Sequence, residues 1–182
     1  MEEHVCPHSH AGFLDNWLRR LVHNPRRIFG SYVGRGDRVL DVGCASGTFT
    51  FALADMVGDG GSVIACDIQE EMLDKLRKKI EEKGVGSVVE ARRCSEDGLG
   101  VSGPFDFVLA FYVVHEVPDP KMFYQEVHTI LGAGGLLMVV EPNSRVTSRE
   151  FGESISLAEE QGLTPSADPK VLFSRAMLLR KP

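Results

Sequence analysis

The stretch VLDVGCASG, residues 39–47, decides the fold of this 182-residue chain. A short apolar run with a single acid leads into a turn that contains Gly43 and Gly47. TFTFALADMV, residues 48–57, follows with the composition of a helix that stops near Gly58. This order of strand, glycine-rich turn and helix predicts the first unit of an α/β sheet that binds a ligand at the turn.

The same alternation continues along the chain. Residues 70–84 carry apolar side chains at helical spacing, with acids early, lysines late and Gly84 as the stop. Residues 136–142 are almost continuously apolar, which suits a strand covered on both faces. Further strands are predicted at residues 62–67, 87–93, 105–114 and 171–181, with at best a weak strand at 163–169, and helices at 120–131 and 147–162.

This pattern predicts an α/β protein with right-handed crossovers. The expected fold is a Rossmann-like, doubly wound, mostly parallel seven-stranded sheet with helices on both faces, formed by residues 37–182. Residues 1–36 are expected to form an arm and a helical lid, because apolar side chains recur at helical spacing in residues 12–23. Ligands of such sheets bind beyond the carboxyl ends of the strands.

Composition limits the functions that are open to the chain. The formal net charge of −6 argues against a general affinity for nucleic acid, whose phosphates need a basic surface. Four arginines lie within residues 18–27, where we favour a solvated helix face. Residues 1–20 lack the apolar core of a signal peptide, and no apolar run could span a membrane. We therefore expect a cytoplasmic protein with no membrane partner.

Two features suggest the ligand. Counted from Gly43, the turn reads Gly-x-Ala-x-Gly, whereas a dinucleotide fingerprint has glycines at the first, third and sixth positions. The shorter pattern favours an uncharged adenosyl and amino-acid group over a pyrophosphate. Asp67 ends the second predicted strand, 24 residues after Gly43, where a ribose-binding acid belongs. Taken alone, Asp67 fits the cap of the following helix equally well.

The successive stretches VLDVGCASGTFTFALA, VIACDIQEEML, FDFVLAFYVVHEVPDP and LGAGGLLMVVEP resemble the motifs of class I S-adenosylmethionine-dependent methyltransferases. The resemblance spans roughly residues 37 to 180 and implies S-adenosylmethionine as cofactor. It places LGAGG where the family usually has a Lys-Pro-Gly-Gly turn, and Cys94 where the family usually has an acid near the adenine amine. The cofactor-binding residues that it implies are Asp41, Gly43, Cys44, Ala45, Gly47, Asp67, Ile68, Cys94, Ser95, Ala110 and Phe111.

Ala45 departs from the family pattern, which has glycine there. We expect its methyl group to be tolerated provided that the residue does not need a positive φ.

Fewer residues of the sequence point to the part of the site that would bind the methyl acceptor. His115 follows the fourth predicted strand and is the expected catalytic base, because imidazole titrates near neutral pH. Glu116 and Glu141 stand close to strand ends as well, and Glu141 could orient a substrate or anchor a loop. Local packing is the alternative interpretation of His115. The expected partner is a small-molecule methyl acceptor, and neither the oligomeric state nor the methylated atom is predicted.

The soft ligands in the sequence do not predict a metal site. His4, Cys6, His8 and His10 lie within seven residues, a poor arrangement for the four-ligand geometry of zinc. Cys44, Cys66 and Cys94 lie on or beside the first three strand ends. We interpret them as small buried hydrophobic residues with free thiols instead of thiolate ligands for arsenic or a metal.

Two other functions stay open at this point. A nicotinamide-dependent oxidoreductase is disfavoured by the glycine spacing. A non-catalytic protein or methyltransferase subunit that binds S-adenosylmethionine or S-adenosylhomocysteine is favoured by the lack of a compelling catalytic residue.

Overall fold

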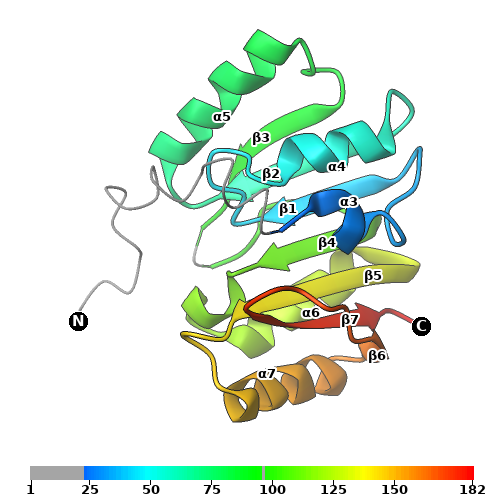
Figure 1. Ribbon diagram of the computed structural model, residues 1–182, viewed down its shortest axis with the longest axis vertical. Helices are drawn as coiled ribbons and strands as arrows, with labels where there is room; N and C mark the ends of the chain where they lie inside the picture. Colours follow the sequence, from blue (N-terminus) through cyan, green and yellow to red (C-terminus); the bar gives the residue numbers. More distant parts are fainter. Residues whose placement is uncertain (1–22, 96) are drawn as a thin grey trace.

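The computed structural model describes residues 23–95 and 97–182, which form one seven-stranded sheet flanked by helices (Figure 1). The strand order is β3-β2-β1-β4-β5-β7-β6; strands β1 to β5 run parallel, and β7 is antiparallel to both of its neighbours. This confirms the predicted doubly wound, mostly parallel sheet. The strands are β1 Arg38–Val42, β2 Ser62–Asp67, β3 Val89–Arg93, β4 Phe105–Phe111, β5 Leu131–Pro142, β6 Thr164–Ala167 and β7 Ser174–Arg180.

Helices cover both faces of the sheet, as alternation along the chain requires. Apolar side chains of α3, α4 and α5 pack on one face, and those of α6 and α7 pack on the other. The central strands β1 and β4 are buried on both sides, so their apolar runs are almost continuous. The helices are α3 Pro25–Phe29, α4 Thr50–Val57, α5 Glu70–Lys83, α6 Pro120–Ile130 and α7 Ser148–Glu160, with a short 3-10 helix, η1, at Val114–Glu116.

Local sequence explains where the helices begin and end. Asp119 caps α6 by accepting a hydrogen bond from the Met122 backbone, and α5 ends at Gly84 in the left-handed conformation. Thr147 and Glu150 form the capping box that their spacing predicts at the start of α7. These ends fix the helices so that each following strand enters the sheet in register.

Several element boundaries differ from the prediction, and those of β5 and β4 bear on the site. LGAGG, residues 131–135, belongs to β5 instead of forming a turn before it, and a register shift in the β4–β5 pairing accommodates it. The backbone of Lys181 satisfies this stretch by hydrogen bonds with Gly134 and Gly135. Strand β4 ends at Phe111, three residues early, because Tyr112 turns to a left-handed φ of 65°.

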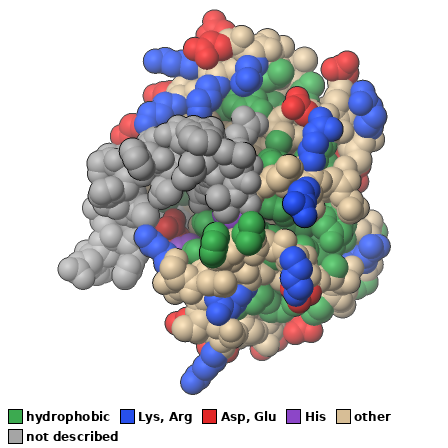
Figure 2. Space-filling view, in the orientation of Figure 1, with side chains coloured by type: hydrophobic (Ala, Val, Ile, Leu, Met, Phe, Trp, Pro, Cys, Tyr) green, Lys and Arg blue, Asp and Glu red, His purple; other side chains and the backbone are tan. Residues whose placement is uncertain are grey.

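The expected helical lid falls largely outside the described residues, so it stays a prediction. Within residues 23–36 the structure has the short helix α3, on which Arg26 and Arg27 are exposed, as a solvated face requires. On the face drawn in Figure 2, Lys and Arg side chains are interspersed with Asp and Glu. No helix among the described residues is long and apolar enough to cross a membrane.

Candidate functional site

The carboxyl ends of the parallel strands meet along one edge of the sheet, at the left in Figure 1. The turn after β1, the end of β2 and the loop after β3 lie together in one half of this edge. The ends of β4 and β5, with η1, form the other half. All the residues predicted from the strand ends therefore fall in one region of the molecule.

Asp67 joins the first two strand ends. Its carboxylate accepts hydrogen bonds from the backbone of Gln69 and of Ala45, each at 2.9 Å, and the residue is 8% exposed. Burial raises the pKa of Asp67, and the backbone N–H groups of Gln69, Ala45 and Ile68 oppose that rise. Because a carboxylate offers about four acceptor positions, Asp67 can still accept hydrogen bonds from a ligand hydroxyl pair.

The glycines of the turn are needed by the fold itself. Gly43 has a φ of 64°, and a Cβ atom there would lie 2.4 Å from Cγ2 of Val113. Gly47 has a φ of 91°, and a Cβ atom there would lie 2.7 Å from Cδ1 of Leu76. The turn can therefore approach η1 and α5 only with glycine at both positions, whether or not a ligand is bound.

From the sequence, the methyl group of Ala45 is expected to be tolerated provided that this residue does not need a positive φ. The structure does not meet this condition. The φ of Ala45 is 48°, in the left-handed region that favours glycine. The conformation is held by the hydrogen bond from the Ala45 backbone to Asp67. The alanine methyl group is therefore accommodated at a cost in backbone strain, which such residues carry most often at functional sites.

Asp41 lies beneath the turn, in the interior. It is 2% exposed, and its carboxylate accepts a 2.6 Å hydrogen bond from the Thr50 hydroxyl at the start of α4. Burial raises the pKa of Asp41 to about 7; the Thr50 hydrogen bond opposes this rise, and the charge of Asp67 adds to it. Asp41 thus ties β1 to α4 and supports the turn from below.

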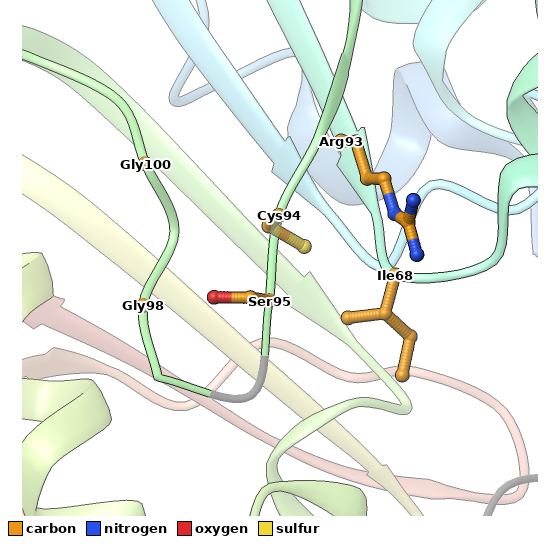
Figure 3. Close-up of a pocket in the computed structure, with 6 residues that line it drawn as sticks. All are labelled: Ile68, Arg93, Cys94, Ser95, Gly98 and Gly100. Carbon is orange, nitrogen blue, oxygen red and sulfur yellow. The ribbon is translucent and has the colours of Figure 1, made fainter.

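A cavity of about 510 Å³ opens beside Asp67, within the size range of small-molecule sites (Figure 3). Three of the predicted cofactor residues, Ile68, Cys94 and Ser95, line it. Sequence reasoning did not single out its other lining residues, because an arginine and two loop glycines carry no ligand signal of their own. These are Arg93, Gly98 and Gly100.

The remaining predicted cofactor residues do not line this cavity, and all of them except Gly43 and Ala45 are buried. Cys44 packs against α5, and its thiol donates to the backbone oxygen of Ala45. Ala110 has no exposed surface, and Phe111 packs its ring against Phe49 with 4.5 Å between ring centroids.

The other half of the edge holds a histidine–carboxylate pair. Nδ1 of His115 in η1 lies 2.5 Å from Oε2 of Glu141 near the end of β5, and the His115 backbone also donates to Glu141. Glu141 is 2% exposed. With Glu141 accepting from Nδ1, the Nε2 atom of His115 carries the free lone pair.

Charges around the pair favour the protonated imidazole. Burial lowers the pKa of His115, but the hydrogen bond and charge of Glu141, together with Glu116, outweigh burial and raise it. Burial raises the pKa of Glu116 as well, and the charge of Asp67 contributes to that rise. In the sheet, β1 alone lies between β2, which carries Asp67, and β4, which leads to His115. Sequence reasoning named His115 and Glu141 separately and missed their pairing, which the adjacency of the fourth and fifth strands could have indicated.

Two further residues near this edge were not singled out from the sequence. Tyr112 and Phe173 both have left-handed φ values, of 65° and 57°, and the Tyr112 hydroxyl lies 2.6 Å from the Ser174 hydroxyl. Nothing in their sequence marks such conformations. Within residues 23–95 and 97–182, no group of three or more His, Cys, Asp or Glu side chains could hold a metal ion. His4, Cys6, His8 and His10 lie outside that part of the chain.

Comparisons with known proteins identify the family of the chain. A family model described as a methyltransferase domain matches residues 34–167. Among curated proteins, the chain is 34% identical over 112 residues to a ubiquinone/menaquinone biosynthesis C-methyltransferase of Teredinibacter turnerae, covering 61% of this chain and 45% of that protein. It is 31% identical over 128 residues to a phosphatidylethanolamine N-methyltransferase of Cereibacter sphaeroides, covering 69% and 61%. The chain thus spans about half the length of the first of these relatives.

Among solved structures, the fold matches that of an S-adenosylmethionine-dependent methyltransferase from Aquifex aeolicus. The TM-score is 0.88 at 22% identity, and the match covers 98% of this chain and all of the other.

Proposed function

The chain belongs to the class I S-adenosylmethionine-dependent methyltransferases, and we propose that it transfers a methyl group from this cofactor to a small-molecule acceptor, with His115 as the base. The observation that carries the proposal is the placement of the His115–Glu141 pair beside the half of the sheet edge that holds Asp67 and the cavity. One half binds the donor in this proposal, and the other activates the acceptor.

The residues at the first three strand ends fit the cofactor. Asp67 has acceptor positions left for the two ribose hydroxyls, and Ile68 and Ser95 line a cavity large enough for adenine. The left-handed conformation of Ala45 sets the path of the turn after β1, which would lie against the methionine part. Gly43, Cys44, Gly47 and Phe111 would contribute through their backbone, and Cys94 would form part of the adenine wall. Asp41 and the fully buried Ala110 would support the site from the interior.

When bound, S-adenosylmethionine supplies a methyl group that is already activated. The chain then has to align the acceptor and remove its proton as the new bond forms. Glu141 fixes the tautomer and the orientation of His115, which leaves Nε2 to take the proton. Glu116, 3.8 Å from Nε2, stabilises the imidazolium that results.

The acceptor that suits this base is a small molecule with a weakly acidic proton, such as a phenolic or enolic hydroxyl or an activated ring carbon. Names of relatives that include a ubiquinone/menaquinone C-methyltransferase and a demethylmenaquinone methyltransferase support this class. An acceptor whose nucleophile has no proton to lose would leave His115 without a role.

Transfer of label from methyl-radiolabelled S-adenosylmethionine tests the proposal. The chain is incubated with a panel of phenols, quinols and primary amines, and with a small-molecule metabolite extract. We expect label in a product extracted from the phenol or quinol arms, and a rate of labelling that is about 10²- to 10⁴-fold lower with the His115→Ala variant. Cofactor binding without any labelled product in every arm would favour the non-catalytic alternative.

A further inference from the structure

Cys94 lies in the wall of the proposed cofactor cavity and has no part in the proposed reaction. It directly follows β3, and its backbone N–H donates a 3.1 Å hydrogen bond to the carbonyl of Asp67. The residue is partly exposed and lines the cavity together with Ile68 and Ser95. Figure 3 shows the Cys94 thiol pointing toward the end of β2, which leads to Ile68.

Cys66, the residue before Asp67 in β2, is the partner of this thiol. It has no exposed surface, and in the parallel β2–β3 pairing it aligns with Arg92, two residues before Cys94, so the two cysteines lie on the same face of the sheet. Both side chains belong to the apolar cluster on the face that α6 and α7 cover. Cys44, the third cysteine in the described part of the chain, instead donates to the Ala45 carbonyl and is buried against α5.

The two thiols are chemically unequal. The hydrogen bond from Cys66 lowers the pKa of Cys94, against the opposing effect of burial and the charge of Asp67. The same hydrogen bond and complete burial raise the pKa of Cys66 well above its ordinary range. Cys94 is therefore the attacking thiol that a reagent in the cavity meets, and Cys66 is a second thiol already in contact with it.

We propose that Cys94 and Cys66 form a redox-modification site for hydroperoxides, whose oxidation to a disulfide closes the cofactor cavity. In the first step, the Cys94 thiolate attacks the peroxide oxygen, the O–O bond breaks, and Cys94 sulfenic acid forms with release of hydroxide, or alkoxide from an organic peroxide. The Cys66 sulfur then attacks the sulfenic sulfur and loses its proton, and hydroxide leaves as water. The peroxide is reduced by two electrons, and the two thiols are oxidised by two.

The link to the cofactor follows from the position of Cys94. An S–S bond of about 2.05 Å is much shorter than a contact between hydrogen-bonded sulfur atoms, so oxidation draws Cys94 toward β2. Ser95, which follows Cys94, forms a backbone bridge with Gly98, so the cavity wall moves with it. Conversely, a cofactor in the cavity shields Cys94 from the peroxide. This coupling rests on the proposed function, whereas formation of the disulfide does not.

The test treats the reduced full chain with hydrogen peroxide, with and without S-adenosylhomocysteine, and measures free thiols, intact mass and disulfide-linked peptides. We expect the loss of two thiols per chain, a Cys66–Cys94 linked peptide, and protection by S-adenosylhomocysteine. Calorimetric titration of the oxidised chain should show a Kd for S-adenosylhomocysteine about tenfold higher than that of the reduced chain, a change that corresponds to about 1.4 kcal/mol. Dithiothreitol should restore the original Kd.

Cys66→Ala and Cys6→Ser are the matched variants. Cys66→Ala should keep the reduced-state Kd and form no disulfide, and Cys6→Ser should behave like the unmodified chain. A thiol count that peroxide leaves unchanged, a disulfide mapped to other cysteines, or equal weakening of binding in Cys66→Ala would overturn the inference. A mapped Cys66–Cys94 disulfide in a chain that never binds S-adenosylhomocysteine would establish the redox site but overturn its link to the cofactor, together with the proposed function.

Discussion

His115 and Glu141 approach to 2.5 Å between Nδ1 and Oε2, although 25 residues separate them along the chain and they belong to different elements. Their pairing depends on the parallel alignment of β4 and β5, which brings η1 beside the end of β5. Glu141 is buried, so its position is fixed by the sheet, and His115 is fixed by Glu141. A base held in this way needs little reorganisation before it accepts a proton.

Replacing Glu141 should change the pH dependence of methyl transfer. His115 must be neutral to act as a base, so the rate rises with pH through its pKa, which lies above the ordinary 6.5. Glu141→Gln removes the charge that raises this pKa, so the acidic limb of the pH–kcat profile should move to lower pH. At the pH optimum, kcat should fall about 10- to 100-fold, and His115→Ala should cost about 10²- to 10⁴-fold.

His128→Asn is the control, because His128 lies in α6, away from the strand ends. It should leave kcat and the pH profile unchanged. An acidic limb that stays in place in Glu141→Gln would show that Glu141 does not tune the base.

Asp67→Asn should weaken cofactor binding without unfolding the chain. The amide oxygen can still accept from the backbone of Ala45 or Gln69, but the charge that would favour the ribose hydroxyls is gone. Hydrogen bonds to charged groups contribute about 1.5–3 kcal/mol, so the Kd for S-adenosylhomocysteine should rise about 10- to 100-fold in calorimetry. Asp74→Asn, which removes an exposed carboxylate of α5, should leave the Kd unchanged. An unchanged Kd in Asp67→Asn would remove Asp67 from the cofactor site.

Ala45→Gly should stabilise the protein. Relief of the left-handed strain at a φ of 48° exceeds the added chain entropy of glycine, for a net gain of about 1 kcal/mol in the free energy of unfolding. For a chain of this length the melting temperature should rise by about 2–4 °C in a thermal scan. Gly43→Ala should do the opposite, because its Cβ atom would clash with Val113. A melting temperature that falls in Ala45→Gly would mean that Ala45 is not strained.

Asp41 should make the stability fall as the pH rises. Its pKa of about 7 in the folded chain lies above the ordinary 3.8, so the folded state binds the proton more tightly than the unfolded state. The contribution of the Asp41 proton to the free energy of unfolding is complete below pH 3.8 and is lost as the pH rises toward about 7. Asp41→Asn lacks this proton, so the stability difference between it and the unmodified chain should change over that range by an amount on the order of a few kcal/mol. Parallel urea-unfolding profiles of the two proteins against pH would contradict the assignment.

Much of the fold could be predicted from local sequence. The strand–turn–helix stretch from Arg38 to Val57, and the helix that ends at Gly84, follow from apolar periodicity and from residues with fixed roles at turns and caps. LGAGG was mistaken for a turn, because its glycines suit a loop in isolation. Its place in β5 depends on hydrogen bonds with Lys181 at the far end of the chain.

The site could be predicted only as a set of separate residues. That Asp67 accepts from Ala45, and that His115 pairs with Glu141, depends on which strands become neighbours. The positive φ of Ala45 is likewise imposed by the hydrogen bond to Asp67. Spacing along the chain identifies the strand ends, whereas distances across the sheet decide which side chains act together.

The proposed function requires the ends of the first three strands to bind an adenosyl cofactor. Calorimetric titration of the reduced full chain with S-adenosylhomocysteine, and separately with NAD⁺, tests it most directly. We expect saturable one-to-one binding of S-adenosylhomocysteine and no binding of NAD⁺. A folded chain that binds no S-adenosylhomocysteine at millimolar concentration, or that binds NAD⁺ more tightly, would contradict it.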